Sequence, residues 1–296
     1  MKLAVLFGGI SSEHDISCLS AASILRHLDQ TRYEIYAVGI TQEGRWYYCP
    51  SCTADSVENG EWERLADKVP ALLPPDRGVH GLVLLQDGKT ETIRLDCVFP
   101  VLHGAGGEDG TIQGLLELAG IPYVGCGVAA SANSMDKSIT KALIEPTGVR
   151  QAKYYLALRY DFERNAEGVV RTAADQLGKF PVFVKPCSQG SSVGVAKAND
   201  MLELAAGLTE AFQLDDKVLV EEYIDGHEVE CAVLGNRNPI ASTVGEIAAT
   251  QEFYTFDAKY KDESSQLYIP AKITPQQIET VRQNALRVYA ALGCRG

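Results

Sequence analysis

The sequence predicts an α/β protein built from more than one compact unit. Segments typical of β-strands alternate with segments typical of helices along most of the 296 residues. Hydrophobic residues make up 46% of the chain and the mean hydropathy is −0.07, as in an ordinary globular protein. Glycine-rich stretches follow two of the apolar runs, where an α/β sheet commonly binds its ligand. A chain of this length can form two or three domains.

Residues 1–125 are expected to form a doubly wound domain. Apolar runs predict strands at 2–7, 33–40, 82–85 and 93–102, and apolar spacing predicts a helix at 17–28. The stretch 50–78 holds prolines and charges with little periodicity, so we expect it to be an insertion outside the core. Glycines around Cys126 predict a domain boundary there.

Residues 126–221 and 222–296 are expected to form two smaller α+β subdomains. A helix at 128–144 and a strand at 154–158 precede a polar helix that ends at Gly178. An antiparallel sheet is predicted from 182–185, 193–198 and 218–224, a hairpin through Asn236 from 228–234 and 240–247, and a further strand at 268–273. The last helix begins with a capping box at Thr274 and Gln277 and ends at Gly293.

The charge and the cysteines exclude several classes of protein. A net charge of −12 and a pI near 4.9 argue against nucleic acid or an anionic membrane as a partner. No apolar run reaches the ~20 residues that span a bilayer, and the first residues lack the features of a signal peptide, so we expect a cytoplasmic protein. The eight cysteines are then expected to be reduced. Cys49 and Cys52 alone cannot complete a tetrahedral zinc site, and we expect them in a surface loop.

The segment 102–114, LHGAGGEDGTIQG, carries the most specific pattern in the chain. It places His103, a glycine-rich turn and two carboxylates between a predicted buried strand and the start of an apolar helix face. Such a loop at the C-terminal edge of a sheet suits a ligand site, although a simple connection is the alternative interpretation.

Two lysines are candidates for binding phosphate. Lys185 precedes a loop of small residues that includes Ser191 and Ser192, whose backbone N–H groups could converge on phosphate oxygens. This pattern differs from the P-loop GxxxxGK[ST]. Lys137 follows Met-Asp on a predicted helix. A serine-rich hairpin turn and a solvated surface lysine are the alternative interpretations.

Acidic residues near the end of one apolar strand suggest a nucleoside site. Glu221, Glu222, Ile224 and Glu228 offer the carboxylates and backbone groups that adenine and ribose require. Solvated acids on an edge strand are the alternative.

Two further segments are candidates for an amino-acid site and its cover. Glu13 follows Gly8 and Gly9, where it could hold a substrate ammonium or, alternatively, complement a helix dipole. The aromatic and basic segment 253–260 has the composition of a lid.

These five motifs occur in the same order in the D-alanine–D-alanine ligases, and the chain resembles that family over essentially its whole length. The resemblance implies an N-terminal pre-ATP-grasp domain followed by two ATP-grasp subdomains, the last one truncated. It also implies a reaction type, in which ATP phosphorylates a carboxylate and an amine then attacks the acyl phosphate.

Carried over residue by residue, the resemblance assigns the candidate site residues to four groups. These are Lys137, Lys185, Ser192 and Lys259 for the ATP phosphates; Glu221, Glu222, Ile224, Glu228 and Phe253 for adenine and ribose; Glu13 and His103 for the first D-alanine; and Glu13, Ser191 and Tyr260 for a catalytic hydrogen-bonded triad that locks the lid.

The implied product is D-alanyl-D-alanine for peptidoglycan precursors, with Mg²⁺ or Mn²⁺ as the metal and a homodimer as a possible assembly. The pair Lys259-Tyr260 is similar to that of the ordinary dipeptide ligases and implies D-alanine as the acceptor. The D-alanine–D-serine ligases keep the same pair, so D-serine is the alternative. Another type of ATP-grasp ligase is disfavoured by the joint presence of the Gly8-Gly9 element, the segment from His103 to Gly114 and the Lys259-Tyr260 pair.

The resemblance also implies one departure. Family members continue with an Arg-x-Asp strand and a Glu-x-Asn motif, in which the Asp, Glu and Asn bind two magnesium ions and the Arg stabilises the tetrahedral intermediate, whereas this sequence ends at Gly296 before them. We therefore expect this chain to lack the metal ligands and to have little activity of its own. A non-catalytic nucleotide-binding chain is the alternative from a different class.

Overall fold

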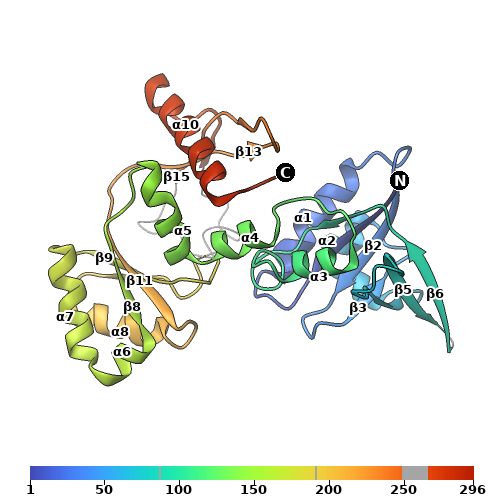
Figure 1. Ribbon diagram of the computed structural model, residues 1–296, viewed down its shortest axis with the longest axis horizontal. Helices are drawn as coiled ribbons and strands as arrows, with labels where there is room; N and C mark the ends of the chain where they lie inside the picture. Colours follow the sequence, from blue (N-terminus) through green and yellow to red (C-terminus); the bar gives the residue numbers. More distant parts are fainter. Residues whose placement is uncertain (87, 191, 249–265) are drawn as a thin grey trace. The chain divides into compact units, whose positions relative to one another are not determined.

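The computed structural model describes residues 1–86, 88–190, 192–248 and 266–296. These residues form two compact units, one of residues 1–132 with Gly296 and one of residues 133–295 (Figure 1). The division into 1–125, 126–221 and 222–296 stays a prediction. No helix among the described residues is long and apolar enough to cross a bilayer.

The first unit contains a seven-stranded mixed sheet in the order β6-β5-β4-β3-β2-β1-β7. β1 runs parallel to both β2 and β7, and the remaining neighbours are antiparallel. The strands are β1 (Lys2–Gly8), β2 (Glu34–Ile40), β3 (Trp46–Tyr48), β4 (Val69–Leu72), β5 (Gly81–Gln86), β6 (Lys89–Arg94) and β7 (Cys97–Pro100).

The single strand expected at 93–102 was wrong, because β6 and β7 lie at opposite edges of the sheet. The chain turns between them at Leu95, which is buried, and Asp96, whose Oδ2 accepts a hydrogen bond from the Lys2 backbone N–H at 2.7 Å. Ile93, Leu95 and Cys97 alternate with the charged residues Arg94 and Asp96, so the pattern of a strand continues across this turn and does not reveal it.

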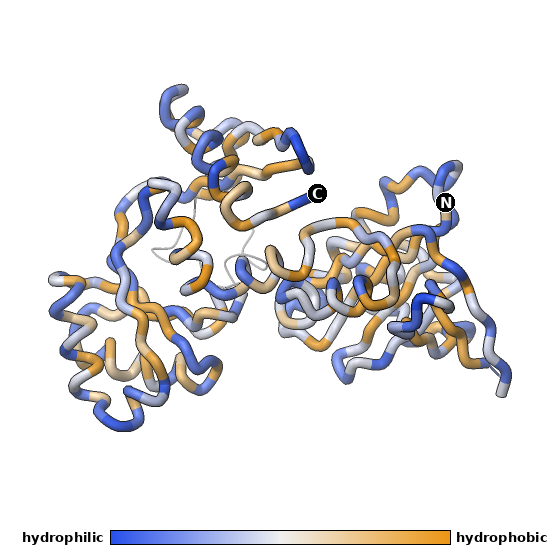
Figure 2. The backbone as a smooth tube through the Cα atoms, in the orientation of Figure 1, coloured by the Kyte–Doolittle hydropathy of each residue, from blue (hydrophilic) through white to orange (hydrophobic). Residues whose placement is uncertain are grey.

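Helices cover both faces of this sheet, which confirms the doubly wound expectation. Leu3, Val5 and Phe7 of β1 pack in one core with residues of α1 (His14–His27), whereas Ala4 and Leu6 pack in a second core with α3 (Thr111–Ala119). Alternate side chains of a strand point to opposite faces, so β1 is buried on both sides. Figure 2 shows hydrophobic stretches, in orange, along the backbone.

The stretch 50–78, expected to be an insertion, instead completes the core of the first unit. It forms α2 (Ala54–Glu58), a 3-10 helix (Glu61–Arg64) and β4. Trp62 is fully buried, and its ring meets Phe7 edge-to-face with centroids 5.2 Å apart. Gly39 makes room for this ring, because a Cβ there would lie 2.2 Å from Trp62. A single large side chain anchors a segment whose own periodicity is weak.

Replacing Trp62 with alanine is expected to lower the free energy of unfolding by about 3–5 kcal/mol, because a large buried side chain is lost and a cavity is left. Urea unfolding of the two proteins, followed by circular dichroism, measures this difference. A loss below about 1 kcal/mol would mean that the segment is peripheral after all.

The second unit is built around a four-stranded antiparallel sheet in the order β10-β9-β11-β8. It contains the three antiparallel strands predicted at 182–185, 193–198 and 218–224, and the strand predicted at 154–158 joins them. Helices α7 and α8 pack on one of its faces. The elements are α4 (Val128–Met135), which spans the boundary between the units, α5 (Lys137–Ile144), a 3-10 helix (Glu145–Thr147), β8 (Tyr154–Leu158), α6 (Arg159–Arg164), α7 (Ala166–Leu177), β9 (Val182–Pro186), β10 (Ala196–Ala198), α8 (Met201–Ala211) and β11 (Lys217–Glu222).

The register of this sheet places charged residues on one face. Val184 and Val220 are paired and lie in the apolar core beneath α7 and α8. Lys185 and Glu221, one position further along each strand, therefore lie on the opposite face. The predicted helix over 128–144 is broken at Asp136, which caps α5 by accepting hydrogen bonds from the N–H groups of residues 138 and 139.

The rest of the second unit contains two small sheets and the last helix. Its elements are β12 (Glu228–Glu230), β13 (Val233–Leu234), β14 (Ile240–Ala241), β15 (Gly245–Ala248), β16 (Gln266–Tyr268) and α10 (Pro275–Leu292). The hairpin through Asn236 and the capping box at Thr274 are confirmed. The strand expected at 268–273 ends at Tyr268, because Pro270 cannot donate to a ladder.

Candidate functional site

The charged face of the second unit gathers two lysines around one carboxylate. Lys185 Nζ of β9 lies 2.6 Å from Glu221 Oε2 of β11, and Lys141 Nζ of α5 lies 2.7 Å from Glu221 Oε1. The side chain of Glu221 is 9% exposed and that of Lys141 is 12% exposed, whereas that of Lys185 is 31% exposed. Of these three groups, the Lys185 ammonium is therefore the most accessible to a ligand.

The two lysines determine the ionisation of Glu221. Burial alone would raise the pKa of this carboxyl, but the charge of Lys185 and the hydrogen bond and charge of Lys141 hold the pKa below its usual range. Glu221 is therefore a carboxylate at neutral pH, and the three groups carry a net charge of about +1.

Lys137 lies at the N-terminus of α5 and points back at the loop after β9. Its Nζ donates to the carbonyl oxygens of Pro186, Cys187 and Gln189, at 3.2, 3.4 and 2.5 Å. Burial, together with the nearby charge of Lys185, lowers the pKa of Lys137. The structure thus places both lysines that are predicted to bind phosphate beside one loop.

Contacts and backbone conformation constrain several described residues of the loop 187–195, which connects β9 to β10. The backbone N–H of Ser188 donates to Asp215 Oδ2 at 2.6 Å. Ser192 adopts φ +62°, a left-handed conformation that is uncommon for a residue with a side chain. Gly194 also has positive φ, and a Cβ there would lie 2.4 Å from Leu214. Ser191 lies outside the described residues.

The predicted nucleoside residues follow Glu221 along the chain. Glu222 Oε1 accepts a hydrogen bond from the backbone N–H of Lys153 at 2.9 Å, Ile224 is 64% exposed just after β11, and Glu228 is exposed at the start of β12. Their contacts with adenine and ribose stay predictions. Phe253, Lys259 and Tyr260 lie outside the described residues.

In the first unit, Glu13 and His103 come together at the C-terminal edge of β1 and β7. Glu13 is buried, and its carboxylate packs against Gly104, where a Cβ would lie 2.5 Å from Glu13 Oε2 and 2.5 Å from Ser11 Oγ. His103 Nε2 lies 3.0 Å from Ser20 Oγ of α1. The two residues predicted for the first D-alanine therefore share one edge of the sheet.

Glu108 raises the pKa of His103 and holds the loop that contains this histidine. The carboxylate of Glu108 lies 3.7 Å from His103 Nδ1 and also accepts a hydrogen bond from the Gly104 N–H at 2.8 Å. Interaction with Glu108 raises the pKa of His103, with a smaller contribution from the charge of Glu13. His103 is thus more readily protonated than a free histidine.

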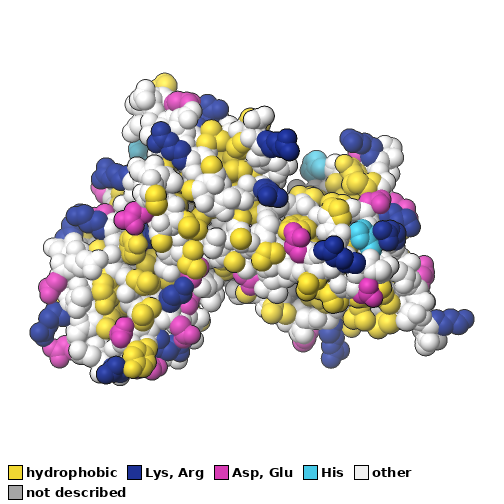
Figure 3. Space-filling model, viewed as in Figure 1, with side chains coloured by type: hydrophobic (Ala, Val, Ile, Leu, Met, Phe, Trp, Pro, Cys, Tyr) yellow, Lys and Arg dark blue, Asp and Glu magenta, His cyan; other side chains and the backbone are white. Residues whose placement is uncertain are grey.

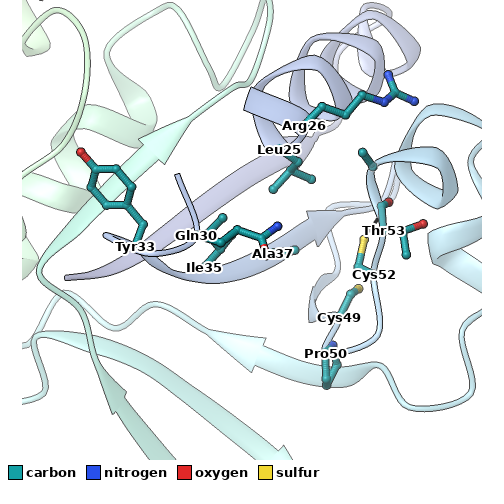
Figure 4. A pocket seen from close by; sticks show the side chains of 11 residues that line it. Leu25, Arg26, Gln30, Tyr33, Ile35, Ala37, Cys49, Pro50, Cys52 and Thr53 are labelled. Carbon is teal, nitrogen blue, oxygen red and sulfur yellow. Dashed lines mark hydrogen bonds between the residues drawn. The ribbon is translucent and has the colours of Figure 1, made fainter. Parts of the chain in front are cut away.

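The pair Cys49 and Cys52 does not lie in a simple surface loop. Cys49 is 2% exposed, and burial raises its pKa to about 12. Both cysteines line a cavity of about 540 Å³ between α1 and the start of α2, with Leu25 and Ile35 on other walls (Figure 4). The surface expectation was wrong for Cys49 because this residue packs in the core beneath α1.

Sequence reasoning missed Lys141, Asp215 and Ser17. Lys141 lies four residues after Lys137, which places both on one face of α5, and that spacing could have identified it. Asp215 and Ser17 act through backbone groups: the Ser17 hydroxyl accepts from the Gly8 N–H and donates to the Val101 carbonyl. No sequence spacing indicates such contacts.

Charged side chains of the described residues are interspersed on the face shown in Figure 3. Acidic and basic side chains both occur over this face.

Two family models match the sequence. One, described as the D-ala D-ala ligase N-terminus, matches residues 2–126, and the other, described as the D-ala D-ala ligase C-terminus, matches residues 143–296. The D-alanine--D-alanine ligase of Acetivibrio thermocellus is 45% identical over 100% of this chain and 81% of the relative. That of Clostridium novyi is 43% identical over 100% of this chain and 82% of the relative.

Solved structures of the same family superpose on nearly the whole chain. The VanG D-Ala:D-Ser ligase from Enterococcus faecalis has a TM-score of 0.88 at 37% identity, covering 99% of this chain and 83% of that one. The D-alanine-D-alanine ligase from Coxiella burnetii has a TM-score of 0.83 at 31% identity, covering 100% of this chain and 79% of that one. From the matches to both family models and to these relatives, the chain belongs to the D-alanine–D-alanine ligase family and has its ATP-grasp fold.

Proposed function

We propose that this protein joins two D-alanine molecules into D-alanyl-D-alanine for peptidoglycan synthesis, at the expense of ATP. The observation that carries the proposal is the pair Lys137 and Lys185 beside the loop 187–195, within a chain of this family. Ammonium groups and a turn of small residues suit the phosphates of a nucleotide.

The reaction requires two transfers. A carboxylate oxygen of the first D-alanine attacks the γ-phosphorus of ATP and ADP leaves, which gives an acyl phosphate. The amine of the second D-alanine then attacks the acyl carbon, and phosphate leaves with the bonding electrons. Lys137 and Lys185 stabilise the phosphate charge, and Ser192, with its neighbours, orients the phosphates. Glu13 receives the ammonium of the first D-alanine and His103 lies beside that substrate.

The remaining assignments follow the family pattern. Glu221, Glu222, Ile224 and Glu228 hold adenine and ribose, with Phe253 on the base and Lys259 at the γ-phosphate. Ser191 and Tyr260, with Glu13, form the triad that closes the lid. The family resemblance also supports a homodimer, which light scattering would test, and a cytoplasmic location.

Mg²⁺ or Mn²⁺ would neutralise phosphate charge during such a transfer. No three His, Cys, Asp or Glu side chains gather as a metal site within the described parts of the chain. We therefore assign no step to the metal here.

D-serine is the alternative acceptor, because one structural neighbour is named a D-Ala:D-Ser ligase. Curated relatives at 42–45% identity are named D-alanine--D-alanine ligases, whereas that neighbour is 37% identical. The higher identity favours D-alanine.

Any turnover by this chain is expected to release phosphate from Mg-ATP only when D-alanine is present, and to form D-alanyl-D-alanine in preference to the mixed dipeptide from an equal mixture of D-alanine and D-serine. A coupled phosphate assay and mass spectrometry of the dipeptides measure both. Phosphate release that ignores D-alanine would refute the ligase proposal, and preferential incorporation of D-serine would replace the acceptor.

A further inference from the structure

Lys141 is a charged residue that the proposed function does not use, although it touches the centre of the nucleotide site. It projects from α5, and its ammonium forms an ion pair with Glu221 Oε1, whereas the ammonium of Lys185 pairs with Glu221 Oε2. Its ammonium also lies 5.0 Å from the centroid of the Tyr154 ring and donates to the Ala152 carbonyl at 3.4 Å. Lys141 is thus held by three groups from two segments, β11 and the start of β8 with the residues before it.

Lys141 and Lys185 differ in exposure, and therefore in how readily their ammonium groups can reach a ligand. The Lys141 side chain is largely enclosed by its partners, so its ammonium is less accessible to a ligand than that of Lys185. Lys185 is more exposed and lies beside the loop 187–195. If Glu221 had Lys185 as its one ammonium partner, their charges would cancel and Lys185 would have to break a buried ion pair to bind phosphate. The second ammonium keeps Glu221 compensated when Lys185 moves to a phosphate oxygen.

We propose that Lys141 is a positioning residue for nucleotide binding: it holds and neutralises Glu221, so that Lys185 can exchange this carboxylate for a phosphate oxygen of ATP. The inference rests on the proposed function and assigns a role to a residue beyond the two phosphate-binding lysines. Lys141 itself does not touch the nucleotide.

The charged surroundings of Glu221 define how the site should respond to pH. Lys185 approaches from β9, and Lys141 and Lys137 from α5, while Tyr154 of β8 faces Lys141. In the native protein the lowered pKa of Glu221 keeps it ionised from pH 8 to pH 5.5. Without Lys141, one of the two cations that lower this pKa is lost, so the pKa of Glu221 lies higher than in the native protein, and protonation of the carboxylate as the pH falls releases Lys185.

The test compares ATP binding by the wild-type protein, Lys141→Met and the control Lys179→Met at several pH values, by isothermal titration calorimetry. Lys179 is an exposed lysine after α7. We expect Lys141→Met to raise the Kd for ATP about tenfold at pH 8, as for loss of one charge-assisted interaction. The ratio of this Kd to the wild-type value should fall toward 1 as the pH is lowered to 5.5. The ratio also removes the effect of protonation of ATP itself.

Three outcomes separate the possibilities. A Kd ratio that stays constant with pH would assign Lys141 a structural role only and overturn the proposal, as would a ratio near 1 at pH 8. Restoration of affinity by Lys141→Arg, and loss of the Lys141→Met effect in a Glu221→Gln background, would support charge compensation. A wild-type protein that does not bind ATP would instead refute the proposed function. Melting temperatures identify any variant that fails to fold.

Discussion

Replacing Lys185 with methionine is expected to lower kcat/KM for ATP by about 100- to 1,000-fold, the largest single loss in the second unit. The substitution removes an ammonium from the phosphate site, and charged groups that stabilise a transferring phosphoryl group contribute on this scale. It also leaves the buried carboxylate of Glu221 with Lys141 as its remaining ion-pair partner. Steady-state kinetics with varied ATP and saturating D-alanine measure the change.

Lys179→Met serves as the control for Lys185→Met, because it removes the same charge from an exposed position. We expect it to leave kcat/KM within about twofold of wild type, as for an exposed charge. A Lys185→Met protein that keeps kcat/KM within about threefold would show that another group binds the phosphates.

Replacing Gly104 with alanine is expected to raise the apparent KM for D-alanine about 100-fold, because the new methyl group would displace the Glu13 carboxylate. The Cβ would lie 2.5 Å from both Glu13 Oε2 and Ser11 Oγ, closer than non-bonded atoms approach. Gly104 also has φ +67°, where alanine costs about 1–2 kcal/mol. Kinetics with varied D-alanine, together with thermal unfolding, measure the two effects.

The chain offers a matched control two residues away. Gly106 has φ +83°, but a Cβ there would meet no atom within 4 Å. Gly106→Ala therefore carries the backbone strain without the collision, and we expect a lower melting temperature with little change in KM. If both variants raised KM equally, strain in the loop rather than the position of Glu13 would explain the loss, and the role of Glu13 would need revision.

Several features of the fold were predictable because they depend on local sequence. The capping box at Thr274, the antiparallel sheet that holds Lys185 and the strand at 154–158 each follow from side-chain periodicity or from hydrogen bonds between near neighbours. The break at Asp136 also has a local cause, since its carboxylate caps the next helix, but continuous apolar spacing concealed it.

Other features of the fold were predicted wrongly because they depend on contacts between residues that are distant in the sequence. Trp62 determines that the stretch around it belongs to the core, and this follows from Phe7 and from the space at Gly39. β6 and β7 are likewise separated because β7 pairs with β1, whereas β6 pairs with β5. Long-range partners leave no periodic signal in the sequence.

The sequence by itself determined the family resemblance, the residue types of the site and the order of its motifs. The tertiary structure decided how these residues interact. It showed that Glu221, which is predicted to bind adenine and ribose, forms ion pairs with two lysines, and it brought Lys141 into the site. It also placed Gly104 against Glu13, ninety-one residues earlier in the chain. Charge compensation and steric exclusion act over a few ångströms in space, so only the folded chain shows which groups they join.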